Sequence, residues 1–419
     1  MTDSHDCCAT PHPLAGMDQA LELLLSQARP VDGMERVPLL AGLGRVLAEP
    51  LVSPIAVPPW DNSAMDGYAV RTSDLGSDRA RLRVAQRIPA GHWGDALAPG
   101  TAARIFTGAP LPLGADAVVI QEVCTREEGP DGAWVQIPAG IAPGANVRAA
   151  GEDMAPGAEV MAAGTRLDPQ HLGLAASVGI GELPVFRRLR VAVLSSGDEL
   201  ASPGEPLGPG QIYNSNRYTL CSLVAALGCE VIDLGIVPDS LEATIAALSQ
   251  AAAASDLILA SGGVSVGEED HVKPAVERLG TLELWQIAMR PGKPLAFGHV
   301  AGTPFIGSPG NPVSLFVTAC LFARPFILRR QGVSGPVRPQ ALTLRAGFDW
   351  PKPDKRRELH RARLEPGPDG EPEVQVHPSR SSGVLSSVTW ATGLAVIAEG
   401  RVLHRGDPLP FIPFSELLR

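Results

Sequence analysis

The sequence predicts a multidomain protein in which a three-layer α/β domain is joined to helical and β-rich domains. The chain has 419 residues, too many for one ordinary core when domains average about 150 residues. Strand-like and helical runs alternate between 190 and 330, which is typical of a mostly parallel sheet covered on both faces. Short β-prone runs between glycine and proline turns dominate other segments. Several separate cores are therefore expected.

Helical patterns flank a β-rich segment in the first half of the chain. Apolar residues recur at helical spacing over 14–28, and a second helical piece is expected over 39–48, before Pro50. Further along, Asp168 and Pro169 have the residue types of an N-cap and a first helical position. The β-rich segment is therefore expected to be inserted within a helical domain.

The clearest pattern lies between 190 and 330, where buried-strand runs alternate with helices. In a mostly parallel sheet, ligands collect outside the carboxyl ends of the strands. The loops expected at that edge are rich in hydroxyl, glycine and carboxylate residues: 195–199, 238–240, 261–270 and 308–312. The sequence therefore predicts a ligand site at this edge.

Changes between helical and β-prone residue patterns along the chain predict the domain boundaries. The expected domains are a flexible N-terminus (1–13), a helical domain (14–50 and 149–186), an inserted β domain (51–148), an α/β domain (187–331) and a C-terminal β domain (332–419). In the N-terminus, Cys7 and Cys8 lie near two histidines and could form a metal tract. A polar, proline-containing terminus is more often a mobile segment.

The loop 261–270 combines a glycine pair with carboxylates. Backbone N–H groups around Gly262 and Gly263 could bind phosphate, although strand-to-helix turns often need glycine for geometry only. Carboxylates occur in several loops at the same edge, namely Asp198, Glu199, Asp239 and Asp270. Together they could hold a hard divalent ion such as magnesium against ligand phosphates. Each one alone could equally be a cap or a turn residue.

Two groups of cations could form an anion site. Arg290 and Lys293 stand close together between prolines, which suits an oxyanion, although a charged hairpin tip is the plain alternative. A second basic run lies in the C-terminal domain: Lys352, Lys355, Arg356, Arg357, Arg361 and Arg363. Such a run is usually a solvated surface. In an acidic protein it is also the natural second half of an anion site.

The overall composition restricts the classes of function. The formal net charge of −10 argues against nucleic-acid binding, which usually needs a basic surface. No uninterrupted apolar run approaches the roughly 20 residues that span a bilayer, so no membrane segment is expected. The first residues lack the order of a secretory signal, and the six cysteines lack zinc-like spacing. A cytoplasmic protein with free thiols is expected.

Short motifs with few apolar residues follow one another along the chain: 61–68, 107–110, 146–148 with 151–153, 196–200, 213–216, 261–270, 291–294 and 309–312. In this order they resemble the signature set of the molybdopterin molybdenumtransferases, the MoeA family, to which the E domain of gephyrin is similar. An ordered set is far more specific than any one motif. The resemblance covers the chain from about residue 14 and implies an elongated helical domain, an inserted β domain, a doubly wound, mostly parallel molybdopterin-binding domain and a C-terminal β barrel.

The resemblance implies an enzyme of molybdenum cofactor biosynthesis. The family reaction takes molybdate and adenylylated molybdopterin, releases AMP in a magnesium-dependent step, and leaves molybdenum on the dithiolene. It also implies a homodimer, with the cleft formed by the α/β and barrel domains of one subunit and the inserted domain of the other. A molybdopterin adenylyltransferase and proteins that handle the finished cofactor are possible partners.

The resemblance also implies roles for individual residues. The residues of the magnesium and pyrophosphate region are Glu199, Asp239 and Asp270. The catalytic residues that reach in from the partner subunit are Asp66, Thr107 and Asp153. The loops that hold the pterin ligand contribute Ser196, Gly197, Gly262, Gly263, Ser265, Pro309, Gly310 and Asn311. The molybdate cluster is Arg290, Lys293, Arg356 and Ser382.

This chain departs from the family pattern at two positions near the oxyanion. Arg290 stands where the family usually has lysine, and Gln286 stands where some members have another lysine. Arginine keeps the charge but changes the geometry of the donors. Arg357 and Arg361 lie close enough in sequence to serve in place of Arg356. The choice between molybdate and tungstate stays open, because the two anions are nearly equal in size and charge.

Two other functions are possible on the same fold: adenylyl transfer to molybdopterin, and a non-catalytic carrier or scaffold. The region around Asp66 and the cations of the C-terminal domain favour metal insertion over adenylyl transfer. The presence of all the expected acids argues against a pure scaffold. A dinucleotide dehydrogenase is not expected, because no Gly-x-Gly-x-x-Gly opens the first helix of the α/β segment.

Overall fold

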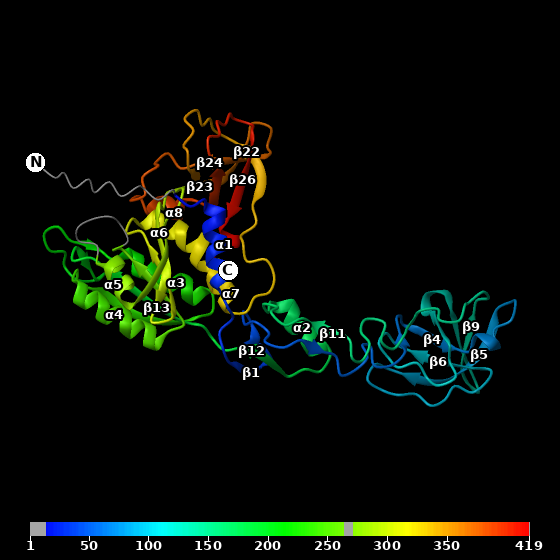
Figure 1. Ribbon diagram of the computed structural model, residues 1–419. Coiled ribbons are helices and arrows are strands. Elements are labelled where there is room, and N and C mark those ends of the chain that lie inside the picture. Colours follow the sequence, from blue (N-terminus) through cyan, green and yellow to red (C-terminus); the bar gives the residue numbers. More distant parts are fainter. Residues whose placement is uncertain (1–13, 264–270, 419) are drawn as a thin grey trace, which may run out of the picture.

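The computed structural model describes residues 14–263 and 271–418. The expected flexible terminus 1–13 with its cysteine pair lies outside the described residues, as do Ser265 and Asp270. The α/β domain and the C-terminal domain lie together at one end of an elongated molecule, and the inserted β domain lies at the other end (Figure 1). A thin connecting region with small sheets joins the two ends.

The α/β domain is built on a six-stranded sheet. The strand order is β16 (Glu230–Val237), β13 (Arg190–Ser196), β17 (Leu257–Ser261), β21 (Thr303–Ser308), β20 (Pro294–Val300) and β18 (Gly280–Gln286). The first four strands run parallel, and β20 and β18 are antiparallel. The sheet is therefore mostly parallel, as predicted.

Helices cover both faces of this sheet. Side chains alternate along β13, so that Val191 and Val193 face a core with α3 (Ser215–Ala226), α6 (Pro312–Thr318) and α7 (Arg324–Arg330). Ala192 and Leu194 face the opposite core with α4 (Leu241–Ala254) and α5 (Val272–Leu279). The expected three-layer arrangement is confirmed.

A long apolar helical segment runs through the first of these cores. It consists of α6, a π-helical turn over Ala319–Ala323 and α7. By length and composition, Pro312–Arg330 could cross a membrane, but 89% of its most apolar window is buried inside the protein. The segment is therefore the central core helix of the α/β domain.

The C-terminal domain is a closed five-stranded barrel. Its strands are β22 (Leu342–Ala346), β23 (Arg357–Pro366), β24 (Pro372–Val376), β25 (Gly393–Ile397) and β26 (Pro408–Pro413). The order β23-β24-β22-β26-β25 closes because β25 also pairs with β23. The short strand β19 (Met289–Arg290) pairs with β23 and joins the barrel to the α/β domain. The barrel that the family resemblance implies is confirmed.

The inserted domain is a second six-stranded sheet with a core on each face. Its order is β7 (Ala117–Ile120), β4 (Gly67–Val70), β6 (Thr101–Ile105), β5 (Ala80–Ile88), β9 (Gly132–Ile137) and β8 (Thr125–Gly129). Two further short strands, β3 (Asn62–Ser63) and β10 (Val147–Arg148), pair with each other beside this sheet.

The connecting region contains α2 (Pro169–Ser177) and small two-stranded sheets. β1 (Met34–Pro38) pairs with β12 (Glu182–Phe186), and β2 (Leu51–Val52) pairs with β11 (Glu159–Met161). The first helix, α1 (Met17–Gln27), instead packs its buried face into the core of the α/β domain. It therefore belongs physically to the α/β end of the molecule.

The expected helix over 39–48 is wrong. Only a 3-10 turn forms over Leu39–Gly42, after which Val46 and Leu47 make isolated bridges to Arg166 and Val185. The apolar spacing is compatible with a helix, but Gly44 adopts a left-handed conformation with φ of +73° that interrupts one. Tertiary pairing with β12 therefore determines the backbone conformation of this segment.

The cysteines that the structure describes carry free thiols, as expected: Cys124, Cys221, Cys229 and Cys320. Burial raises the pKa of the Cys320 thiol to about 12. That of Cys124 is raised to about 11 by the same cause. These two thiols are therefore protonated at neutral pH.

Candidate active site

A cavity of about 510 Å³ opens where the predicted edge of the α/β sheet faces the barrel. The α/β domain contributes Ser196, Glu199, Leu200, Ile212, Tyr213, Asn214, Ser215, Asn216, Ser261, Gly262, Gly310, Asn311 and Pro312, and the barrel contributes Gly383. These residues come from the loops after β13, β17 and β21 and from the start of α3. The cavity therefore lies at the carboxyl ends of parallel strands, where such sheets usually bind ligands.

The floor of this cavity is backbone. Gly262 has φ of +84°, and a Cβ atom at this position would lie 2.6 Å from the carbonyl oxygen of Ser196. On the other side, a Cβ atom on Gly310 would lie 3.9 Å from Cα of Gly262. Only glycine at position 262 lets the loops after β13 and β17 approach this closely. The glycines therefore let these loops pack closely at the wall of the cavity.

Two asparagines at the start of α3 line the cavity and have buried polar atoms. Asn214 and Asn216 are 2% and 9% exposed, and their Nδ2 and Oδ1 atoms, respectively, have no hydrogen-bond partner among the described residues. Their other amide atoms are in use: Asn214 Oδ1 accepts from the N–H of Arg217, and Asn216 Nδ2 donates to the carbonyl of Gly310 at 2.7 Å. Buried polar atoms normally have partners. Both atoms are closed off from solvent, so a ligand in the open cavity does not contact them as they stand.

The sequence motif 213–216 contained these asparagines, but they were not predicted as site residues. The signal was available in part, because an asparagine directly before a helical run is a common N-cap. An N-cap role explains the hydrogen bond that Asn214 Oδ1 accepts. It does not explain the position of Asn214 Nδ2 or of the Asn216 side chain. Only the structure shows that both residues line the cavity.

The acidic residues occupy two different positions at this edge. Glu199 lines the cavity, and its carboxylate has no hydrogen bond from the residues that the structure describes. Asp239 instead accepts from the hydroxyl of Ser196 at 2.6 Å and from the N–H of Asp198 at 3.2 Å. In return, the N–H of Asp239 donates to the Asp198 carboxylate at 3.0 Å. The loops after β13 and β16 are thus tied together beside Glu199.

The described acids include no group of three or more side chains arranged to hold a metal ion. Asp270, the remaining predicted ligand, lies outside these residues. Glu199 and Asp239 nevertheless present carboxylate oxygens, which are the donors that magnesium prefers. The donor chemistry at this edge therefore fits magnesium.

The other predicted pterin-binding residues have different positions. Ser196, Gly262, Gly310 and Asn311 line the cavity. Gly197, Gly263 and Pro309 lie in the same loops without being lining residues. Gly197 has φ of +153°, and a Cβ atom there would lie 2.5 Å from the Glu199 carboxylate. Its role is therefore to leave room for Glu199.

A second cavity, of about 300 Å³, contains all four residues of the predicted oxyanion cluster. Its lining is Met289, Arg290, Pro291, Gly292, Lys293, Ser314, Arg356, Arg380, Ser381 and Ser382. The two cavities adjoin, because the N–H of Val313 donates to the carbonyl of Ser382 at 3.0 Å. Next to this pair in sequence, Pro312 and Gly383 line the first cavity, and Ser314 and Ser381 line the second. An extended ligand could therefore occupy the first cavity and reach the second.

The cations of the second cavity are only partly neutralised. Arg356 pairs with Asp354 at 2.9 Å, and Arg290 reaches the same carboxylate at 3.4 Å. The hydrogen bonds from Arg356 hold the pKa of Asp354 well below its usual value, so this carboxylate is ionised at neutral pH. The Lys293 side chain makes no ion pair or hydrogen bond within the described part of the chain. The cavity therefore retains excess positive charge.

The three arginines that sequence alone left as alternatives have different positions in the structure. Arg357 pairs with Asp18 at 3.0 Å and Glu399 at 3.2 Å, away from the cavity. Arg361 is buried and donates to the hydroxyl of Ser387 and to backbone carbonyls of the loop that carries Ser382. Arg356 is the one that lines the cavity. Gln286 lies on β18 and is not a lining residue.

Two of the predicted catalytic residues, Asp66 and Thr107, lie together in the inserted domain. Asp66 accepts hydrogen bonds from the backbone N–H and the hydroxyl of Thr107, both at 2.8 Å. The backbone hydrogen bond, followed by that of the hydroxyl, lowers the pKa of Asp66. Asp153 is exposed in a loop whose N–H group at Ala150 donates to Asp61. The motifs of this domain therefore converge in space.

None of these residues lines either cavity. The inserted domain lies at the opposite end of the molecule from the α/β domain and the barrel (Figure 1). Within one chain, the predicted catalytic residues are thus divided between two distant places.

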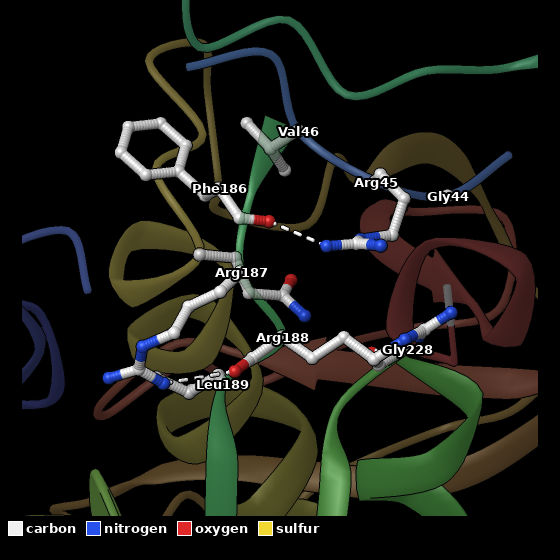
Figure 2. A pocket seen from close by; sticks show the side chains of 9 residues that line it. Gly44, Arg45, Val46, Phe186, Arg187, Arg188, Leu189 and Gly228 are labelled. Carbon is white, nitrogen blue, oxygen red and sulfur yellow. Dashed lines mark hydrogen bonds between the residues drawn. The ribbon is translucent and has the colours of Figure 1, made fainter. Parts of the chain in front are cut away.

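A third cavity lies where the connecting region meets the α/β domain (Figure 2). Its volume is about 10 Å³, which is room for about one water molecule. Its arginines already have partners: Arg45 donates to the carbonyl of Phe186, Arg187 pairs with Asp256, and Arg188 donates to the carbonyl of Gly228. This cavity is a structural junction and not a ligand site.

Comparison with known families agrees with this arrangement of sites. Residues 15–179 match the MoeA N-terminal region (domain I and II), 192–329 match a probable molybdopterin binding domain, and 343–414 match the MoeA C-terminal region (domain IV). Together these matches include both cavities and the pair of Asp66 and Thr107 in the inserted domain.

Similar proteins extend over nearly the whole chain. The molybdopterin molybdenumtransferase of Haemophilus influenzae is 39% identical over 408 residues, covering 96% of this chain and 99% of the relative. Molybdopterin molybdenumtransferase 2 of Mycobacterium tuberculosis is 41% identical over 342 residues, covering 78% and 83%. The structure of the molybdopterin biosynthesis MoeA protein of Pyrococcus horikoshii has a TM-score of 0.82 at 28% identity and covers 96% of this chain and 100% of that one. The chain therefore belongs to the MoeA family of molybdopterin molybdenumtransferases, transferases of molybdenum cofactor biosynthesis.

Proposed function

We propose that this enzyme inserts molybdate into adenylylated molybdopterin and releases AMP in a magnesium-dependent step. The observation that carries the proposal is the pair of adjoining cavities. One is lined by glycine loops, serine and asparagine residues and the carboxylate of Glu199, and the other offers excess positive charge. An adenylylated pterin and an oxyanion need these two environments side by side.

Each group has a role that follows from its position. The glycine loops at Gly262 and Gly310 face the phosphates of the ligand, and Asn214 and Asn216 line the cavity beside them. Lys293 and Arg356 attract molybdate and orient it toward the first cavity. The two reactants are thereby held next to each other, which lowers the entropy cost of their reaction.

Glu199 and Asp239, together with Asp270, are the residues that would hold magnesium. When bound, the ion neutralises charge on the phosphates of the ligand. Ser196 holds the Asp239 carboxylate at 2.6 Å and so orients it. Glu199 faces the cavity with its oxygens available.

AMP release from purified adenylylated molybdopterin, with magnesium and with or without molybdate, tests this function. We expect release that molybdate stimulates and that yields cofactor able to activate a molybdenum-free apoenzyme. ATP-dependent adenylation of molybdopterin would instead indicate the adenylyltransferase. Tight binding without AMP release would indicate a carrier or scaffold.

The division of the catalytic residues supports a homodimeric active site. We propose that Asp66, Thr107 and Asp153 of one subunit complete the cavities of the other, because none of them lines either cavity and the inserted domain, which carries Asp66 and Thr107, lies at the far end of the molecule (Figure 1). Asp66 is held as a carboxylate by Thr107 and is ready to act on a bound ligand. We place this enzyme in the cytoplasm, downstream of an adenylyltransferase that supplies its substrate.

Mixing two inactive variants tests the shared site. Asp66→Asn and Glu199→Gln should each lose AMP release, because each removes one carboxylate. After subunit exchange, about half of the dimers are mixed and one of their two sites is intact, so about a quarter of the wild-type activity should return.

The matched control for this experiment is a mixture of Asp66→Asn with Thr107→Ala. Both changes lie in the same domain, so no mixed dimer has an intact site and no activity should return. A mixture of Asp66→Asn and Glu199→Gln that stays inactive after proven subunit exchange would contradict the shared site.

A further inference from the structure

Arg380 lines the second cavity but is not in the predicted oxyanion cluster. It lies in the loop that also carries Ser382, two residues away. The Arg380 guanidinium carbon lies 3.7 Å from the ring centroid of Trp350. This is a close cation–π contact, which holds the guanidinium over the face of the indole.

The indole beneath Arg380 is itself fixed by buried polar groups. Trp350 is 4% exposed, and its Nε1–H donates to the Glu358 carboxylate at 2.8 Å. Nε2 of His360 lies 3.4 Å from the other oxygen of Glu358, and the His360 ring is 4.3 Å from the Trp350 ring. Burial opposes ionisation of Glu358, but the neighbouring His360 and the hydrogen bond from Trp350 outweigh it and lower its pKa. These buried contacts therefore fix the position of the Trp350 indole.

The other arginines near the cavity have their donors partly occupied. Arg356 and Arg290 share Asp354, as described above. Arg380 makes no ion pair or hydrogen bond with any side chain or carbonyl that the structure describes. A stacked guanidinium keeps its N–H donors at the edge of the plane, where they are free to bind an anion. Arg380 thus combines a fixed orientation with unused donors.

We propose that Arg380 is a further ligand of the tetrahedral oxyanion substrate, and that Trp350 and Glu358 are the residues that position it. This inference rests on the proposed function of the second cavity. The occupant is a dianion of the molybdate class, held by Arg380 in addition to Lys293 and Arg356. Glu358 acts only through Trp350 and does not touch the ligand.

Equilibrium dialysis of molybdate against the full-length protein without pterin tests the proposal. Arg380→Gln should raise the dissociation constant about 10-fold, which corresponds to about 1.4 kcal/mol. In the AMP-release assay, it should raise the molybdate concentration for half-maximal stimulation. The rate at saturating molybdate should stay near that of the wild type, because Arg380 lies on the oxyanion side of the site.

The matched control is Arg363→Gln in the same barrel. Arg363 also stacks on a tryptophan, Trp390, at 4.4 Å, but it pairs with Glu365 and does not line the cavity. This variant should bind molybdate as the wild type does. Equal weakening in both variants would mean that a general loss of barrel structure or charge explains the effect, and would overturn the proposal.

A reference variant, Lys293→Ala, separates the failure of this inference from the failure of the proposed function. If Lys293→Ala weakens molybdate binding and Arg380→Gln does not, Arg380 is not a ligand but the cavity remains the oxyanion site. If the wild type binds molybdate and neither variant changes the affinity, the oxyanion site lies elsewhere and both assignments are wrong.

Discussion

Gly262→Ala is expected to reduce AMP release at least about 100-fold, because a displacement of about 1 Å at a reacting centre can have such an effect. The added methyl group would lie 2.6 Å from the carbonyl oxygen of Ser196, so one of the two loops must move. The φ of +84° at this position also disfavours alanine by about 1–2 kcal/mol. Both effects act where the ligand phosphates are proposed to bind.

Steady-state AMP release and thermal unfolding should be measured together for this variant. Movement of the Ser196 loop also disturbs its hydrogen bond to Asp239, so activity should fall much more than stability. Gly181→Ala is a suitable control, because a Cβ atom there meets nothing within 4 Å and its φ is not in the left-handed region. Near-normal activity of Gly262→Ala would show that the ligand does not lie against this loop.

Asp256→Asn is expected to lower the free energy of unfolding by about 2–4 kcal/mol. The Asp256 side chain is 10% exposed and binds Arg187 through two hydrogen bonds, at 2.7 and 2.8 Å. It also accepts from the N–H of Arg190 at 2.9 Å. Asp256 thus anchors the chain where the connecting region enters the α/β domain, and its loss leaves the two guanidinium groups without this carboxylate. The midpoint of thermal unfolding should fall by roughly 5–10 °C.

The difference between wild type and Asp256→Asn should depend on pH. Burial opposes ionisation of Asp256, but the hydrogen bonds from Arg187 and Arg190 outweigh it and hold its pKa well below the ordinary value. Because the folded-state pKa is lowered, the stabilisation is fully present above the unfolded-state pKa of about 4 and is lost as the pH falls below it. The difference in unfolding free energy should therefore be constant near pH 7 and shrink below about pH 4.

Asp369→Asn is the control for this prediction. Asp369 also binds an arginine, Arg345, through two hydrogen bonds, but it lies on the exposed surface of the barrel. Exposed pairs contribute little to stability. Equal unfolding midpoints for the wild type and Asp256→Asn at pH 7 would show that the buried pair does not anchor the junction.

Much of the α/β domain could be predicted from the sequence because its signals are local. Apolar runs such as β13 and β17 are flanked by glycine and hydroxyl residues, and the helices between them begin at capping residues such as Ser240. The loops at the carboxyl ends of such strands must lie at one edge of the sheet. The location of the ligand cavity followed from that rule.

Other features depended on contacts between residues far apart in the sequence. The helical spacing over 39–48 was overruled by bridges to Arg166 and Val185. Arg356, Arg357 and Arg361 are near neighbours with the same charge, and only the position of each on the barrel separates a cavity residue from a surface pair and a buried anchor. Sequence spacing does not contain that information.

The sequence by itself determined the order of the domains, the edge of the sheet where the first cavity lies and the residue types that line the two cavities. Local periodicity and the chemistry of short motifs are sufficient for these. The tertiary structure alone decided that the two cavities adjoin, that Asn214 and Asn216 have unpartnered atoms, and that Arg380 is held on Trp350. These features arise where two domains pack against each other, and no local rule specifies which side chains meet at such an interface.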